Sequence, residues 1–80
     1  MKTPELQQKM MDELGLEERD FGHHATDLYV VAKPGIKEWL NENLSHPKNV
    51  TAFTGQAGSD WNGAGKLCYD IPFMGNWPSK

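Results

Sequence analysis

The stretch DLYVVAKPGIKEWL, from Asp27 to Leu40, contains the clearest strand and the clearest helix of this 80-residue chain. Its first seven residues are rich in β-branched and aromatic side chains and end at a Pro-Gly pair, which predicts a strand over 27–33. Apolar residues fall on both faces of this strand, as is typical of a central or doubly covered position. A helix is predicted over 34–44, beginning at Pro34, and its apolar residues share one face: Ile36, Trp39, Leu40 and Leu44.

The residues before this stretch predict a second helix and a connector. Thr3 and Pro4 are typical of a helix start, and Gly15 is typical of a helix end, so we expect a helix over 3–14. Residues 17–26 follow neither the helical nor the strand period, and we expect them to form a connector. Acidic residues dominate 12–20; a solvated surface is the simpler interpretation, and a docking face for a basic partner is the alternative.

The residues after this stretch predict two strands, over 50–54 and 67–73, joined by the glycine-rich loop 55–65. The Asn62-Gly63 pair in this loop is a hairpin signal, and Pro72 indicates an edge strand or a strand end. The predicted fold is therefore a single α+β domain with elements in the order α-β-α-β-β. We expect helices packed on a small mixed three-stranded sheet, with a right-handed crossover if the strands around the central helix are parallel.

Charge and cysteine content exclude several classes of function. The chain has 8 basic and 11 acidic residues, and the basic ones are scattered, so nucleic-acid binding is not expected. Cys68 is the only cysteine, which excludes an internal disulfide and fits a reducing compartment. The sequence lacks the apolar core of a signal peptide and any membrane-spanning run, so we expect no membrane association and a cytoplasmic location.

A metal site at His23, His24 and Asp27 is the first chemical hypothesis, because imidazole and carboxylate groups bind transition metals. Adjacent histidines point in different directions in most backbone geometries, and His46, the remaining histidine, follows a different element. We therefore expect these residues to be polar groups at a strand entrance. No metal and no cofactor is predicted.

A thiol nucleophile at Cys68, assisted by a histidine and Asp70, is the second chemical hypothesis. Cys68 falls in the middle of a predicted strand, where no glycine elbow or helix start presents it, so a structural cysteine is the better interpretation. The loop sequence GSDWNGAGK lacks the Walker spacing and leads into a strand, so no phosphate site is expected. The sequence therefore predicts no catalytic residue.

A partner-binding surface is the third hypothesis, and it rests on large side chains near the end of the chain. Three tryptophans cannot all be central in so small a core, so one or two are expected at a surface or an interface. Trp61 lies in the glycine-rich loop, where it either folds back onto the sheet or contacts a partner. The predicted contact residues are Trp61, Asn62, Phe73, Met74 and Trp77.

The run DLYVVAKPGIKEWL, followed by CYDIPF and a tryptophan near the end, resembles the small uncharacterised accessory proteins that phages and prophages encode. This resemblance implies a protein that acts in a bacterial host by binding and blocking a host protein, as anti-CRISPR proteins do. It implies no functional residue. A non-enzymatic protein-binding module is thus the leading hypothesis; a small metal-dependent or thiol enzyme and a homodimeric structural module are the alternatives.

Overall fold

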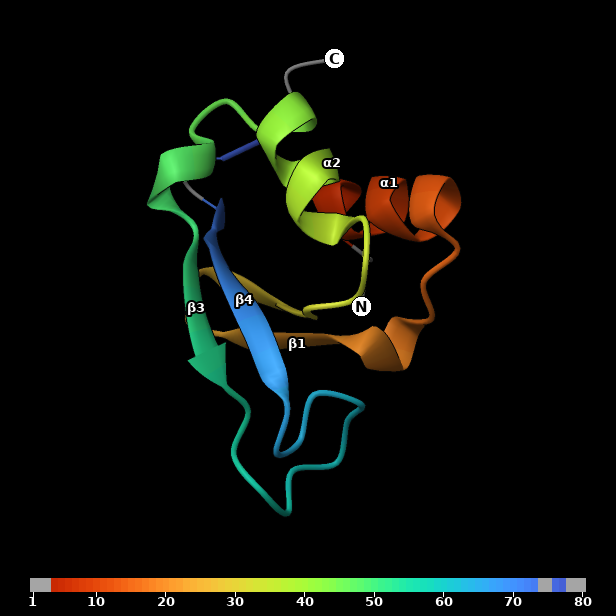
Figure 1. Cartoon of the computed structure of the whole chain (residues 1–80), viewed down its shortest axis with the longest axis vertical. Helices are drawn as coiled ribbons and strands as arrows, with labels where there is room; N and C mark the ends of the chain where they lie inside the picture. The colour runs from red at the N-terminus through yellow and green to blue at the C-terminus, as the bar shows by residue number, and fades with distance from the viewer. Residues whose placement is uncertain (1–3, 74–75, 78–80) are drawn as a thin grey trace.

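The computed structural model describes residues 4–73 and 76–77, and it confirms the α+β class. Two helices and four strands follow one another with two short 3₁₀ turns between them (Figure 1). The elements are α1 (Glu5–Leu14), η1 (Glu18–Asp20), β1 (Phe21–His24), β2 (Asp27–Val31), α2 (Ile36–Asn43), η2 (Pro47–Asn49), β3 (Thr51–Thr54) and β4 (Leu67–Pro72). Neither of the helices so described is long and apolar enough to cross a membrane.

The sheet has four strands in the order β1-β2-β4-β3, and every neighbouring pair is antiparallel. The prediction of a mixed three-stranded sheet was therefore wrong. The expected connector contains β1, which folds back on β2 through a two-residue turn at 25–26. The parallel crossover is absent from the described residues because β4 inserts between β2 and β3 and runs antiparallel to both. Pro72 ends this central strand and does not mark an edge.

Glycines with positive φ set two of the helix boundaries. Gly15 ends α1 in the left-handed conformation, with φ of 68°, and its N–H donates to the Met11 carbonyl. Gly35 has φ of 91°, which a right-handed helix does not accommodate, so α2 begins at Ile36 and not at Pro34. Pro4 precedes α1 as its N-cap, and the predicted cap Thr3 lies outside the described residues.

Both helices pack on the same face of the sheet and form the hydrophobic core with it. The sheet contributes Phe21, Leu28, Val30 and Ile71, and the helical layer contributes Leu6, Met10, Ile36, Trp39, Leu40 and Leu44. Trp39 also joins the two helices, because its indole N–H donates to Glu13 Oε1 at 2.9 Å. The strands' other face receives neither helix, and Figure 1 shows loop 55–65 extending from the end of the sheet away from them.

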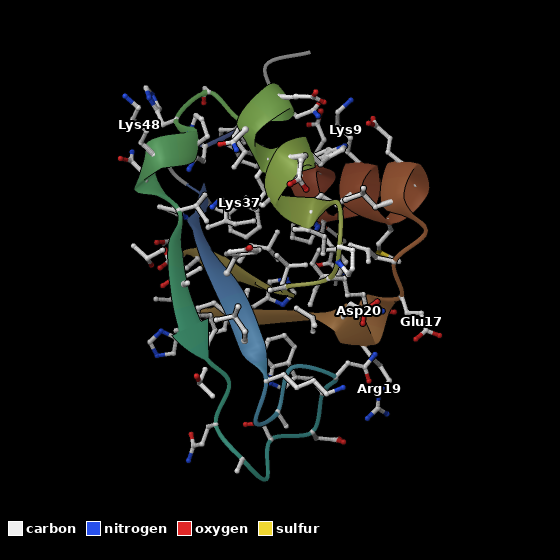
Figure 2. All side chains as sticks on the ribbon, in the orientation of Figure 1. Lys9, Glu17, Arg19, Asp20, Lys37 and Lys48 are labelled. Carbon is white, nitrogen blue, oxygen red and sulfur yellow. The ribbon has the colours of Figure 1, made fainter. Side chains whose placement is uncertain are left out.

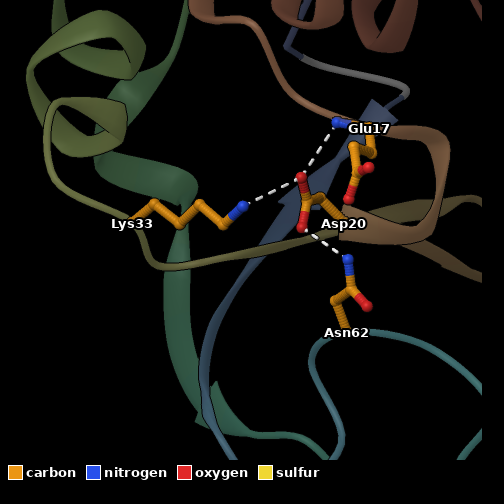
Figure 3. A network of polar contacts seen from close by, with 4 residues as sticks. All are labelled: Glu17, Asp20, Lys33 and Asn62. Atoms are coloured by element: carbon orange, nitrogen blue, oxygen red, sulfur yellow. Dashed lines mark hydrogen bonds and ion pairs between the residues drawn. The ribbon is translucent and has the colours of Figure 1, made fainter.

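A buried carboxylate, Asp20, connects three segments that are distant in the sequence (Figure 3). One oxygen, Oδ2, accepts the Glu17 N–H at 2.9 Å and the Lys33 ammonium at 3.1 Å. The other, Oδ1, accepts the Asn62 side-chain amide at 2.9 Å. Burial alone would raise the pKa of Asp20, but these donors outweigh it and lower the pKa. Asp20 thus attaches the glycine-rich loop to η1 and to the segment before α2.

Asp20→Asn should lower the free energy of unfolding at neutral pH by about 2 kcal/mol, because Lys33 and the Glu17 N–H lose a buried ionised acceptor. The folded-state pKa of Asp20 is depressed, so its contribution is present above the ordinary pKa of 3.8 and is lost as pH falls through the folded value. Urea unfolding from pH 7 to pH 3 should show the two proteins converging at the acidic end. Asp60→Asn, at an exposed ion pair with Arg19, is the control and should change little. A constant difference at every pH would contradict the ionic role.

Candidate functional site

Strand alternation divides the polar residues of the sheet between its two faces. Leu28 and Val30 of β2 point toward the helices, so Asp27, Tyr29 and Val31 point away from them. The register of the neighbouring strands extends this second face, which we call the open face. Its members are His24, Asp27, Tyr29, Val31, Thr51, Phe53, Cys68 and Asp70, together with Trp61 from the loop.

Aromatic rings form a continuous group around Tyr29 at the centre of the open face. The centroid of the Phe53 ring lies 4.5 Å from that of Tyr29, and the His24 ring stacks parallel to Tyr29 at 6.1 Å. The Trp61 ring lies on a further side, at 6.4 Å. Tyr29, Phe53 and Trp61 are each half-buried. The open face therefore presents π surfaces that are accessible and held in place by one another.

Trp61 folds back onto the sheet, which was one of the two positions expected for it. Its indole lies over Gly22, where a Cβ atom would be 3.5 Å from Trp61 Cε3. Gly63 passes so close beneath the ring that a Cβ there would lie 2.5 Å from Trp61 Cζ2 and 2.7 Å from Cys68 Sγ. Glycine at position 63 is thus required by close packing, and the loop acts as a partial cover over the β1 side of the open face.

Two carboxyl groups, those of Asp27 and Asp70, lie among these rings. Burial, followed by hydrogen bonding to and repulsion from Asp27, raises the pKa of Asp70 to about 6, and His24 offsets part of this effect. Asp70 Oδ1 is buried, and it has no hydrogen-bond partner within 4–73 and 76–77. Two carboxylates this close repel each other when both are ionised, so a proton or an added cation stabilises the pair.

The structure separates the two histidines that suggested a metal site. His24 belongs to the open face, whereas His23 points toward the helices and its Nε2 lies 2.9 Å from Gln7 Oε1. His46 precedes η2, and its backbone N–H donates to the Asn76 side chain. Within the described ranges, no three His, Cys, Asp or Glu side chains are placed to hold a metal ion.

Cys68 occupies a position that suits packing. The residue is buried, and Sγ lies 3.5 Å from the Gly63 carbonyl and 3.3 Å from the Lys66 carbonyl. Burial raises the pKa of the Cys68 thiol, although a backbone hydrogen bond from Gly55 opposes this effect. A buried, protonated thiol is a poor nucleophile, so this environment is that of a structural cysteine.

Of the other predicted contact residues, the three that the structure describes, Asn62, Phe73 and Trp77, do not join the open face. Asn62 is engaged by Asp20, and Phe73 packs against the core and against Trp77 at 5.8 Å between ring centroids. Trp77 is 47% exposed and its carbonyl accepts the Ser45 N–H, beside the end of α2. Met74 lies outside the described residues. The tail and the Trp61 loop are therefore two separate surfaces.

A shallow pocket of about 380 Å³ beside β1 is a further concave region. Its polar groups largely bond to one another: Arg19 pairs with Asp60 at 3.4 Å, and His23 is bonded to Gln7. The open face differs, because its carboxyl pair has no basic residue bonded to it in the described part of the chain. The unsatisfied charge makes the open face the stronger candidate site.

Sequence reasoning did not identify Tyr29, Phe53 and Asp70 as a group. Part of the signal was present in the strand period of β2, since Asp27 and Tyr29 alternate with the buried Leu28 and Val30, but the burial pattern of β4 shows no such alternation. Only the register, which pairs Tyr29 with Asp70, shows that the two sets share one face. No protein-family model matches the sequence, and no curated protein or solved structure matches the chain.

Asp70→Asn should stabilise the protein at pH 7 by on the order of 1 kcal/mol, because it removes a partly buried charge beside Asp27. The folded-state pKa of Asp70, about 6, lies above the ordinary value of 3.8. The contribution of Asp70 to folding stability is therefore complete below pH 3.8 and is lost as the pH rises through the folded-state pKa. The stability advantage of the variant should therefore grow from pH 4 to pH 7 in urea unfolding. Asp12→Asn, on the exposed side of α1, is the control. A variant less stable than the parent at pH 7 would contradict the repulsion.

Proposed function

We propose that this protein is a small protein-binding module, and that its open face binds a partner segment carrying a lysine or arginine side chain. The observation behind the proposal is the Asp27–Asp70 pair, in which the buried Asp70 Oδ1 has no hydrogen-bond partner among the described residues and which lies within a group of aromatic rings. Carboxylates bind ammonium and guanidinium groups by charge-assisted hydrogen bonds, and aromatic faces attract the same cations. The carboxylates and the aromatic rings therefore both favour a lysine or arginine side chain.

The chemistry of the open face selects against an anionic partner. A phosphate backbone would be repelled by Asp27 and Asp70, and no basic group in the described chain is bonded to these carboxyls to reverse the local charge. A neutral apolar partner would bury the carboxyl pair without compensation, which is unfavourable. A cationic side chain with apolar neighbours is not repelled by the carboxyl pair and compensates its charge when the pair is buried. Folded and extended protein segments supply such side chains.

The phage resemblance gives this proposal a biological setting. A phage-encoded module of this kind would act as a modulator or inhibitor of a bacterial host protein, by covering a segment that the host protein needs for its own contacts. Under this proposal Trp61 would take part in the contact together with Tyr29 and Phe53, because the three rings lie near one another. Trp77 lies outside it, so substitution of that residue serves as a control for the location of binding.

Binding to a defined peptide tests the proposal. The probe is an acetylated and amidated heptapeptide, Thr-Lys-Thr-Val-Thr-Lys-Thr, and its counterpart has glutamate in place of both lysines. Calorimetric titration at pH 7.5 and low salt should show binding of the lysine peptide at least tenfold tighter than that of the glutamate peptide. Asp70→Asn and Tyr29→Ala should each weaken the lysine peptide about fivefold, which corresponds to about 1 kcal/mol.

Trp77→Ala is the matched control, because it also removes an exposed aromatic side chain and should leave the affinity unchanged. Equal binding of the two peptides would overturn the proposal. A loss on Trp77→Ala without a loss on Tyr29→Ala would instead place the binding surface at the tail.

A further inference from the structure

The β3 strand is an edge of the sheet, and its residues Thr51, Ala52 and Thr54 are exposed within the described part of the chain. It is the last strand in the order β1-β2-β4-β3, and Figure 1 shows it as the outermost strand on the side away from α1. The sequence of β3, TAFT, contains no charged residue and no proline. Charged residues and proline are what usually prevent an edge strand from pairing with another strand. The opposite edge is flanked by the loop, because the Asn62 N–H donates to the Arg19 carbonyl just before β1.

The register shows which backbone groups of β3 point outward. The Gly55 N–H donates to the Lys66 carbonyl at 2.8 Å, so Gly55 faces β4. Alternation in an antiparallel pair then directs the N–H and C=O groups of Phe53 and Thr51 toward β4 as well. The N–H and C=O groups of Ala52 and Thr54 consequently point away from the sheet, where a further strand would pair with them.

We propose that the partner segment binds as a fifth strand along β3, with its lysine or arginine opposite Thr51 and directed across the open face to Asp70. This inference rests on the proposed function and names its binding mode. Addition of a strand to an exposed sheet edge is a general mode of peptide recognition, in which backbone hydrogen bonds supply affinity and alternate side chains supply specificity.

A row of cross-strand partners that begins at Thr51 runs from the β3 edge to the Asp27–Asp70 carboxyl pair. Thr51 is the direct cross-strand partner of Asp70, and Asp70 is that of Tyr29. An added strand would lie two interstrand spacings from β4, or roughly 10 Å. Only a long side chain crosses this distance, and threonine at position 51 is small enough to let it pass. The residue of the partner opposite Phe53 would be apolar, because it packs beside that ring.

The helix side of the same edge offers a place for the partner's alternate side chains. A groove of about 190 Å³ opens there, between the helical layer and the last two strands. Its lining is mixed and comprises Lys37, Leu40, Asn41, Pro47, Val50, Ala52 and Tyr69, so the basic Lys37 disfavours a cationic side chain there. A side chain that alternates away from the open face would enter this groove, so small or apolar residues are expected at those positions of the partner.

A second copy of this chain is a poorer occupant of the edge. Pairing β3 with β3 would bring TAFT against TAFT, and no residue of that segment carries a positive charge. The carboxyl pairs of both copies would stay uncompensated. The occupant that satisfies both the backbone groups and the charge is therefore a different protein with a cationic extended segment.

The outward N–H of Ala52 provides a specific test. Ala52→Pro removes this donor while the hydrogen bonds of Thr51 and Phe53 to β4 are retained, since proline is tolerated on edge strands where the N–H faces solvent. Ala52→Val is the matched control, because it adds bulk at the same position and keeps the N–H. The probe is the heptapeptide Thr-Lys-Thr-Val-Thr-Lys-Thr, which reads the same in both directions.

Calorimetry should show Ala52→Pro weakening this peptide at least fivefold relative to Ala52→Val, with thermal unfolding confirming that both variants are folded. The isomeric peptide Thr-Thr-Lys-Val-Lys-Thr-Thr, whose lysines fall on the other face from its valine, should bind at least fivefold more weakly to the parent protein.

If Ala52→Pro binds as tightly as Ala52→Val while Asp70→Asn still weakens binding, strand addition is wrong and the cation site stands. If light scattering shows a dimer that Ala52→Pro dissociates, the occupant is a second copy and the inference is overturned.

Discussion

The described helices, α1 and α2, cover only one face of the four-stranded sheet, and this constraint determines the arrangement of the remaining residues. A domain of about 80 residues buries a modest share of its surface, and both described helices lie on one face of this sheet. Leu28, Val30 and Ile71 meet the helices and form the core. The residues that alternate with them lie on the face that neither described helix covers, so their side chains stay in partial contact with water.

The open face is stabilised by aromatic contacts and by one folded-back loop. The rings of His24, Phe53 and Trp61 lie near Tyr29, and Trp61 covers Gly22 from the loop. The loop itself is held by the bond between Asn62 and Asp20, whose carboxylate also binds Lys33 (Figure 3). Figure 2 shows Asp20 lying beside Glu17 and Arg19 at the start of β1. The buried Asp20 carboxylate, directly before β1, therefore helps to hold the loop that covers part of the open face.

The elements with strong local patterns were predictable from the sequence. The strand at Asp27, the Gly15 helix end and the hairpin of β3 and β4 all follow from residue type and spacing. The strand β1 was missed, because Gly22 has low strand propensity and the strand forms by pairing with β2. The antiparallel order was missed for a related reason, since no local signal tells β4 to insert beside β2.

The candidate site was less predictable than the fold, because its parts come together only through register. Asp20 reads as one acid in an acidic segment, yet it is buried and bonded to Asn62, 42 residues away. Asp70 reads as a polar residue on a strand, yet it meets Asp27 from a different strand. His23 and His24, by contrast, were expected to point in different directions, and strand alternation does send them to opposite faces. For Asp20 and Asp70, tertiary contact, and not residue type, decides the role.

The most direct test of the open face as a cation site is a pH titration of the Asp70 carboxyl carbon by nuclear magnetic resonance, with and without saturating lysine heptapeptide. In the free protein the pKa should be near the raised value of about 6. A bound ammonium group stabilises the carboxylate, so peptide binding should lower the pKa of Asp70 by about one unit or more. A pKa that stays the same, or that rises, when the peptide is bound would contradict the assignment.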